Sequence, residues 1–415
     1  MTSTHALYDA YEQRYWRELV RRTRSRGIEF VLGRREGPYV WERDSGFRLL
    51  DCGLTGGVHG LGHRHPDILA ALTGALEAGL DSGLWNFPTH EMLAFQDLMA
   101  ALAPVPALNR TVVTLGATAS IDLAVQFCAR VTGRHKVLAY RHGYHGHAGF
   151  AAMVTGSESE GIAGHYGLPN STARFFPNYG VLDDVAAAMG PDIAAIIIEP
   201  FNYETFAPPP ADYLPGVEAL CRRHGALLII DETRTGLSRS GRLWMSEHDA
   251  FTPDILISGK GLGGGLYPVS ALLTTEAIYD DCINGHAYGF ASSMAGNEIA
   301  CTVGRRVLEV ASRPETLAHV ARLEARFREA FAALCERHPG VYAPAHIRGG
   351  VVTLGLRDPA DADAIGPALF RHGVYCHSVS LVDPLVVKFF PVLTAPLDIV
   401  DEVAEALDRF ARRGH

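Results

Sequence analysis

Asp231 and Lys260 each follow a short apolar run that predicts a buried strand. Open α/β sheets bind their ligands at the carboxyl ends of parallel strands, which is where both side chains would lie. Lys260 is flanked by Gly259 and Gly261, so its amine is unhindered and can form a Schiff base with an aldehyde. Asp231 can pair with a protonated pyridine nitrogen and keep that ring able to accept electrons. Taken singly, a solvated loop lysine and a helix-capping aspartate are the competing interpretations, but the two together favour imine chemistry.

Two nucleotide-binding motifs are excluded at Lys260. Gly259, Gly261 and Gly264 match the spacing GxGxxG, but that motif should open a helix. Pro268 and the apolar run Val269–Leu273 follow instead, and they predict another strand. A phosphate-binding P-loop would need Ser or Thr directly after the lysine, where Gly261 stands.

A second segment could hold an anionic group. Gly116, Ala117 and Thr118 lie between a predicted strand and a predicted helix, and their small side chains leave the backbone amides accessible. A helix N-terminus adds partial positive charge, so the turn is a candidate phosphate site. An ordinary helix cap at Thr118 is the alternative.

Two groups of histidines could suggest a metal, but neither has the spacing of a metal site. They are His59, His63 and His65, and His142, His145 and His147. We interpret both groups as structural or substrate-pocket residues and expect no metal. Tyr144, within the second group, could stack on a flat ring.

The middle of the chain alternates apolar runs with helical patterns, which predicts a mostly parallel sheet covered on both faces. The expected strands are 111–115, 136–140, 193–198, 227–230, 255–258 and 269–273, and a helix is expected over 119–131. Towards the ends we expect a hairpin over 39–52, a helical region from 300 to 338, strands at 351–356 and 385–390, and a last helix from 397 to 412. The predicted division is an N-terminal segment (1–60) and a C-terminal part (306–415), which together form a smaller α+β domain, and a large α/β domain (61–305).

Composition narrows the class of protein further. The net charge is −9 and no basic stripe is present, which argues against a nucleic-acid partner. No signal peptide and no apolar run of membrane-spanning length is found. Seven cysteines are scattered without a CxxC pair, which is typical of a reducing cytoplasm.

The sequence resembles the class III aminotransferases, which are pyridoxal-phosphate enzymes of fold type I. The motifs that carry the resemblance span nearly the whole chain: GPYVWERDSGFRLLDCG, LGHRHPDI, GYHGH, IIIEPF, LLIIDETRTG, PDILISGKGLGGG, SSMAGNEIA and FFPVLT. The GYHGH stretch looks most like glutamate-1-semialdehyde aminomutase and its relatives.

The resemblance implies a role for each matching residue. Lys260 would be the Schiff-base lysine and Asp231 the partner of the pyridine nitrogen. Further cofactor-binding positions would be Gly116, Ala117 and Thr118 at the phosphate, Tyr144 and Thr233 on the ring faces, Arg234 near the phenolic oxygen, and Ser293 reaching a phosphate across a homodimer interface. Trp85, Glu204 and Lys388 would contact the substrate.

Several of these positions depart from the family pattern. The phosphate turn usually reads Gly-Ser/Thr-Glu-Ala, but Ala117 and Thr118 occupy its middle. Arg234 stands where Gln is common, and Lys388 stands where many members carry an Arg for the substrate carboxylate. Lysine cannot reproduce the planar two-point clamp of arginine. Glu204 with Lys388 is therefore either a substrate gate or a salt bridge, and Trp85 either lines the substrate entrance or belongs to the core.

The implied function is amino-group transfer between a small amine or amino acid and a carbonyl compound, with pyridoxal phosphate as cofactor, in specialised biosynthesis. An aminomutase, an epimerase or a carbon–carbon bond-forming enzyme on the same scaffold is the first alternative. A non-catalytic binding or regulatory homologue is the second, and the presence of Lys260 and Asp231 argues against it.

Overall fold

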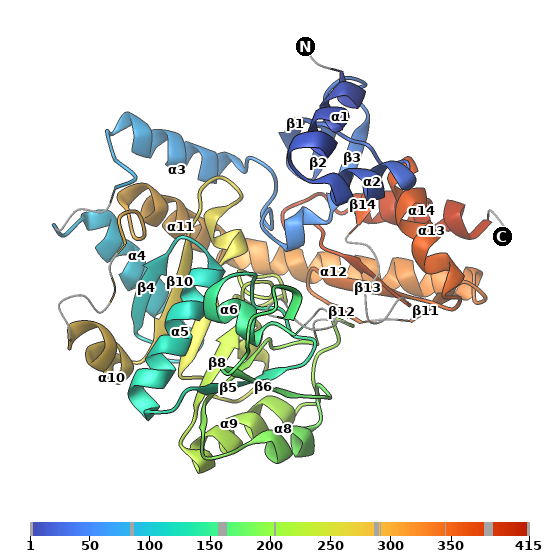
Figure 1. Ribbon diagram of the computed structural model, residues 1–415. Coiled ribbons are helices and arrows are strands. Elements are labelled where there is room, and N and C mark those ends of the chain that lie inside the picture. Colours follow the sequence, from blue (N-terminus) through green and yellow to red (C-terminus); the bar gives the residue numbers. More distant parts are fainter. Residues whose placement is uncertain are drawn as a thin grey trace. The chain divides into compact units, whose positions relative to one another are not determined.

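The computed structural model describes residues 3–83, 87–156, 164–202, 205–285, 290, 292–344, 346–376 and 385–412 (Figure 1). The chain divides into two compact units. Unit 1 combines residues 1–65 with 318–415, and unit 2 comprises residues 66–317. Among the described helices, none is both long enough and apolar enough to cross a membrane.

A seven-stranded sheet forms the centre of unit 2, in the order β4-β10-β9-β8-β7-β5-β6. Its strands are β4 (Arg110–Thr114), β5 (Lys136–Tyr140), β6 (Ala173–Phe176), β7 (Ile193–Ile198), β8 (Leu227–Asp231), β9 (Ile255–Ser258) and β10 (Ser270–Thr274). Neighbours from β9 to β6 are parallel, whereas β10 runs antiparallel to both β9 and β4. The strand predicted after Pro268 is thus present, which confirms that Lys260 does not open a dinucleotide-binding helix.

Both faces of this sheet are covered, because alternate residues of its strands point to opposite sides. Ile197 and Ile229 pack on the face that carries α5 (Ala117–Thr132) and α6 (Gly149–Val154). Ile196 and Ile230 pack on the face that carries α8 (Leu182–Ala188) and α9 (Tyr213–His224). The remaining helices of unit 2 are α3 (Pro66–Glu77), α4 (His90–Ala101), η2 (Met245–His248), η3 (Lys260–Gly263), α10 (Glu276–Tyr279), η4 (Asp280–Asn284) and α11 (Glu298–Ala311).

Unit 1 contains two small sheets with helices from both ends of the chain. One has the order β1-β2-β3-β14, and in the other β13 pairs with β11, β12 and β15. Their strands are β1 (Leu32–Glu36), β2 (Tyr39–Glu42), β3 (Arg48–Cys52), β11 (Tyr342–Ala343), β12 (Ile347–Arg348), β13 (Val351–Leu356), β14 (Val374–Cys376) and β15 (Val386–Phe389). The helices are α1 (Thr4–Arg14), α2 (Arg17–Ser25), η1 (Leu54–Gly56), α13 (Ala360–Arg371) and α14 (Ile399–Arg412), together with most of α12 (Pro314–Arg337).

The predicted fold class is confirmed: a mostly parallel sheet forms the large unit, and both chain ends build the smaller α+β unit. Several elements were not predicted, and two of the differences have a clear physical reason. The helical region expected from 300 to 338 is two helices, because Pro314 lacks the amide needed to continue α11 and begins α12 instead. Strand β6 was not predicted, because ARFF is short and lies at the edge of the sheet, where only one neighbour shapes its sequence.

Candidate active site

The strand ends of unit 2 bring the predicted catalytic residues together. Asp231 is the last residue of β8, and Lys260 stands two residues beyond the end of β9. The two strands are parallel neighbours, with Asp231 paired to Ile257. Thr233 links the two side chains, since its Oγ1 lies 2.7 Å from Oδ1 of Asp231 and 3.4 Å from Nζ of Lys260.

Lys260 has a left-handed backbone conformation, and the pKa of its amine is lowered. Its φ is +44°, a left-handed conformation that non-glycine residues seldom adopt and that is concentrated at functional sites. Burial of the amine and the positive charge of Arg234 lower the pKa of Lys260 to about 8, although Asp231 and Glu199 oppose the change. A larger fraction of the amine is therefore unprotonated, and so nucleophilic, near neutral pH.

Asp231 is buried and held by three hydrogen-bond donors. Its Oδ1 accepts from the backbone amide and the hydroxyl of Thr233, at 3.1 and 2.7 Å. Its Oδ2 lies 2.9 Å from Nδ1 of His145, which is buried as well. Burial alone would raise the pKa of Asp231, but His145, Lys260 and Thr233 outweigh it, so the pKa lies below its ordinary value. The site therefore contains a fixed negative charge.

The loop that carries Tyr144 is fixed from three sides. The Tyr144 amide donates to Oε2 of Glu199 at 3.2 Å, directly after β7. The amides of His145 and Gly146 donate to Oγ1 of Thr155, at 2.9 and 3.0 Å. Together with the His145–Asp231 contact, these bonds hold the half-buried Tyr144 ring, whose centroid lies 5.9 Å from Nζ of Lys260.

The candidate phosphate turn lies beside this cluster. Gly116 precedes α5, and no side chain caps that helix. A Cβ atom built on Gly259 would lie 3.0 Å from Cβ of Ala117, so the turn that carries Lys260 packs against the start of α5. Ser120, in the first turn of α5, is fully buried, and its hydroxyl bonds to Thr114 and Ser270.

Gly146 allows the Tyr144 loop to pass close to α5. Its φ is +134°, and a Cβ atom there would lie 2.5 Å from Oγ1 of Thr118. We expect Gly146→Ala to lower the free energy of unfolding by about 1–3 kcal/mol, because it adds this clash to a strained backbone. Urea unfolding measures the change, with Gly79→Ala as a matched control: Gly79 also has a positive φ (+77°), but a Cβ atom there meets nothing within 4 Å. Equal losses in the two variants would contradict the predicted clash.

Of the four remaining sequence-predicted residues, two lie within the described part of the chain. Ser293 is exposed on the segment before α11, in unit 2. Lys388 is buried on β15, in unit 1, opposite Thr353 of β13. Trp85 and Glu204 lie outside the described residues.

The histidines fall into different environments. His63 lies 2.9 Å from Asp51 through Nε2 and stacks on His59, with 4.1 Å between the ring centroids. Burial and neighbouring His63 lower the pKa of His59 to about 4. In the part of the chain that the structure describes, no group of three or more His, Cys, Asp or Glu residues is arranged to hold a metal ion.

His145 and Glu199 are site residues whose contacts the sequence analysis missed. Glu199 had a usable signal, because like Asp231 it is an acid placed directly after a buried apolar strand. Burial raises its pKa to about 6, with Asp231 adding to the rise and His145 and Arg234 opposing it. For His145, nothing in the sequence indicated a role in the site other than its position next to Tyr144.

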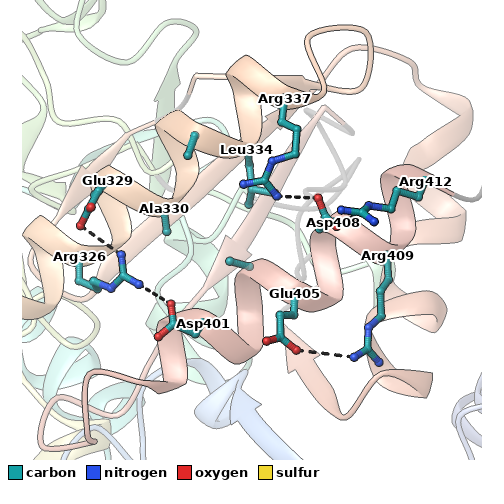
Figure 2. Close-up of a pocket in the computed structure, with 12 residues that line it drawn as sticks. Arg326, Glu329, Ala330, Leu334, Arg337, Asp401, Glu405, Asp408, Arg409 and Arg412 are labelled. Carbon is teal, nitrogen blue, oxygen red and sulfur yellow. Dashed lines mark hydrogen bonds and ion pairs between the residues drawn. The ribbon is translucent and has the colours of Figure 1, made fainter.

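A hollow of about 530 Å³ lies between α12 and α14 in unit 1 (Figure 2). Its basic residues Arg326, Arg337, Arg409 and Arg412 all form ion pairs with acidic residues that also line it: Glu329, Asp401, Glu405 and Asp408. Opposite charges are balanced here, so the groove lacks the concentrated charge of an ionic binding site.

Comparison with known proteins identifies the fold and then the family. The ornithine aminotransferase of Toxoplasma gondii superposes with a TM-score of 0.86, at 22% identity, over 99% of this chain and 96% of that one. The fold is therefore fold type I of the pyridoxal-phosphate enzymes. The family model for class III aminotransferases matches residues 21–411, and the chain belongs to that family.

Curated relatives agree with this assignment. An uncharacterised aminotransferase of Archaeoglobus fulgidus is 33% identical over 394 residues, which cover 92% of this chain and 88% of the relative. An acetylornithine aminotransferase of Corynebacterium efficiens is 34% identical over 378 residues, covering 87% of this chain and 88% of the relative. The chain is thus a pyridoxal-phosphate-dependent aminotransferase, as predicted.

The residues of unit 2 fit this cofactor. An amine with a lowered pKa can bind an aldehyde, and a buried carboxylate with a lowered pKa can face a cationic ring nitrogen. Tyr144 offers an aromatic face, and the uncapped start of α5 offers backbone amides to a phosphate. Glycine at 259, where a Cβ atom would approach Ala117 and Ser270, lets these groups lie close together.

Proposed function

We propose that Lys260 is the coenzyme-binding and proton-transferring amine of this aminotransferase, and that Asp231 is the anion facing the ring nitrogen. The observation that carries the proposal is the Thr233 hydroxyl between them, 2.7 Å from the carboxylate of Asp231 and 3.4 Å from the amine of Lys260. Gly116, Ala117 and Thr118 would hold the phosphate, and Tyr144 and Thr233 would enclose the ring.

Each residue of the candidate site would have a separate role. When bound, pyridoxal phosphate supplies an aldehyde for amino groups and a ring that accepts electron density. Lys260 would hold the aldehyde of this group through its amine, and as a general base it would take the proton from the substrate carbon that bears the amino group. Asp231 would supply a negative charge to the ring nitrogen, and His145 holds that carboxylate in place. Glu199 and Thr155 hold the loop that orients Tyr144.

We propose an amino acid as the amino donor. The support comes from relatives whose names specify such substrates, namely acetylornithine aminotransferases and succinylornithine transaminases of 28–34% identity. A test offers the purified holoenzyme single amines: N-acetylornithine, N-succinylornithine, ornithine, alanine and an amine without a carboxylate. Transamination predicts that a productive donor converts the coenzyme to its amino form in the absence of a carbonyl acceptor. Turnover without that conversion would favour the aminomutase, epimerase or bond-forming alternative.

Lys388 and Glu204 are proposed to contact the substrate, Lys388 at a carboxylate. We expect Lys388→Met, which keeps the apolar stem but removes the charge, to raise KM for a carboxylate-bearing substrate roughly tenfold or more, since hydrogen bonds to charged groups contribute about 1.5–3 kcal/mol. KM for an amine without a carboxylate should stay unchanged, and so should kcat for both. If the free energy of unfolding falls while both KM values stay as in the wild type, Lys388 is a structural residue of unit 1.

We further propose a homodimer that works in the cytoplasm. Ser293 is exposed, and the neighbouring Met294 is 46% exposed, as expected if a second copy covers this segment. None of the seven cysteines forms a disulfide, which suits a reducing compartment. Sedimentation of the holoenzyme tests the assembly, and mixed dimers carrying Ser293→Ala in one subunit should bind coenzyme more weakly at one of the two sites.

A further inference from the structure

Arg234 and Lys260 place two cations near the aromatic ring of Tyr144. Its guanidinium carbon lies 5.3 Å from the centroid of the Tyr144 ring, and Nζ of Lys260 lies 5.9 Å from the same centroid. Arg234 is only 8% exposed, so water screens its charge little.

The geometry decides which of the two cations gives up its proton. Arginine stays protonated under all ordinary conditions, and its planar group is held on the aromatic face of Tyr144. Lysine titrates readily when it is buried near another cation. Repulsion between the two charges therefore acts on Lys260, whose pKa is lowered by burial first and by Arg234 second.

Two anions oppose the lowering of the Lys260 pKa. Asp231 at the end of β8 and Glu199 directly after β7 both raise the pKa of Lys260. The Asp231 carboxylate also hydrogen-bonds to His145 and Thr233, and the Tyr144 amide donates to Glu199. Both carboxylates therefore also have partners other than Lys260, and the positive charge of Arg234 also acts on Glu199.

We propose that Arg234 is a positioning residue whose positive charge increases the fraction of the Lys260 amine that is unprotonated at neutral pH, and so controls how readily that amine reacts with carbonyl groups. This inference rests on the proposed role of Lys260. It assigns to Arg234 a function that a neutral Gln could not perform, because Gln exerts no charge repulsion on the amine.

The full chain freed of coenzyme provides the test. Its three lysines are Lys136, Lys260 and Lys388, so peptide mapping after brief acetylation resolves each amine separately. The rate of Lys260 acetylation, followed against pH, should have its midpoint near pH 8 in the wild type. Lys136, which pairs with Asp192 near the surface, serves as an internal standard for reagent activity.

Three variants separate charge from packing. Arg234→Gln and Arg234→Met remove the charge and should raise the midpoint of Lys260 acetylation by about one pH unit. The unprotonated fraction of the Lys260 amine at pH 7 would then be about tenfold smaller. Arg234→Lys keeps a cation and should retain most of the wild-type behaviour, with its new lysine resolved on a different peptide. Thermal unfolding identifies any variant that fails to fold, and either neutral variant alone is sufficient for the comparison.

The outcomes distinguish this inference from the proposed function. An unchanged midpoint in a folded neutral variant would overturn the role of Arg234, even if borohydride fixes the coenzyme to Lys260 in the wild type. An upward shift in the neutral variants, absent in Arg234→Lys, supports it. Failure of the wild type to fix coenzyme at Lys260 would refute the proposed function, whatever the midpoint.

Discussion

Replacing Lys260 with alanine is expected to lower turnover by about 10⁴-fold or more, because one amine serves both to bind the coenzyme and to transfer a proton. The fold should survive, since the side chain makes only one weak hydrogen bond, at 3.4 Å to Thr233. Steady-state rates with the productive amino donor measure the loss, and urea unfolding checks the fold.

Lys136→Ala is the matched control for this prediction. Lys136 ends at the surface of the same sheet and pairs with Asp192 at 2.9 Å, so its loss should leave turnover near that of the wild type. Residual activity of Lys260→Ala within tenfold of the wild type would show that another group transfers the proton.

Replacing Asp231 with asparagine is expected to lower kcat by about 10²–10³-fold, because a neutral amide cannot stabilise a protonated ring nitrogen. The change also breaks a buried pair with His145, and removing one partner of such a pair destabilises a protein by about 3–5 kcal/mol. The pKa of Asp231 lies below its ordinary value in the folded chain, so its contribution to stability is present above that ordinary value. The contribution is lost as pH falls through the lowered pKa.

Two measurements test the role of Asp231 together. The difference in free energy of unfolding between wild type and Asp231→Asn should be constant at neutral pH and shrink in acid. Asp192→Asn, on an exposed acid with ion-pair partners, should change kcat little. An Asp231→Asn enzyme with wild-type kcat would remove Asp231 from the site, even if its stability were lowered.

The sheet was predictable because its strands are buried on both faces. Ile193–Ile198 and Ile255–Ser258 were expected with the bounds that the structure shows, since a fully buried strand is an uninterrupted apolar run. Pairing order was not predictable from the residues alone, because the order of neighbours depends on contacts distant in the sequence. The antiparallel β10 between β4 and β9 is the clearest case.

Residues of the candidate site were predictable only where they follow the end of a predicted strand. Asp231 and Lys260 share that signal, and the structure brings them to a common hydroxyl of Thr233. The contact of His145 with Asp231 could not be predicted from the sequence, because the two residues are 86 positions apart. The burial of Lys388 was also hidden, since its sequence neighbours predict a strand but not which partner covers it.

Reductive trapping tests the central claim most directly. Purified protein is supplied with pyridoxal phosphate, treated with borohydride, digested, and mapped over the peptides that contain its three lysines. The account predicts a yellow protein with the coenzyme fixed to the side chain at position 260 and to neither of the other two lysines. A colourless protein, or a label at another amine with position 260 unmodified, would contradict it.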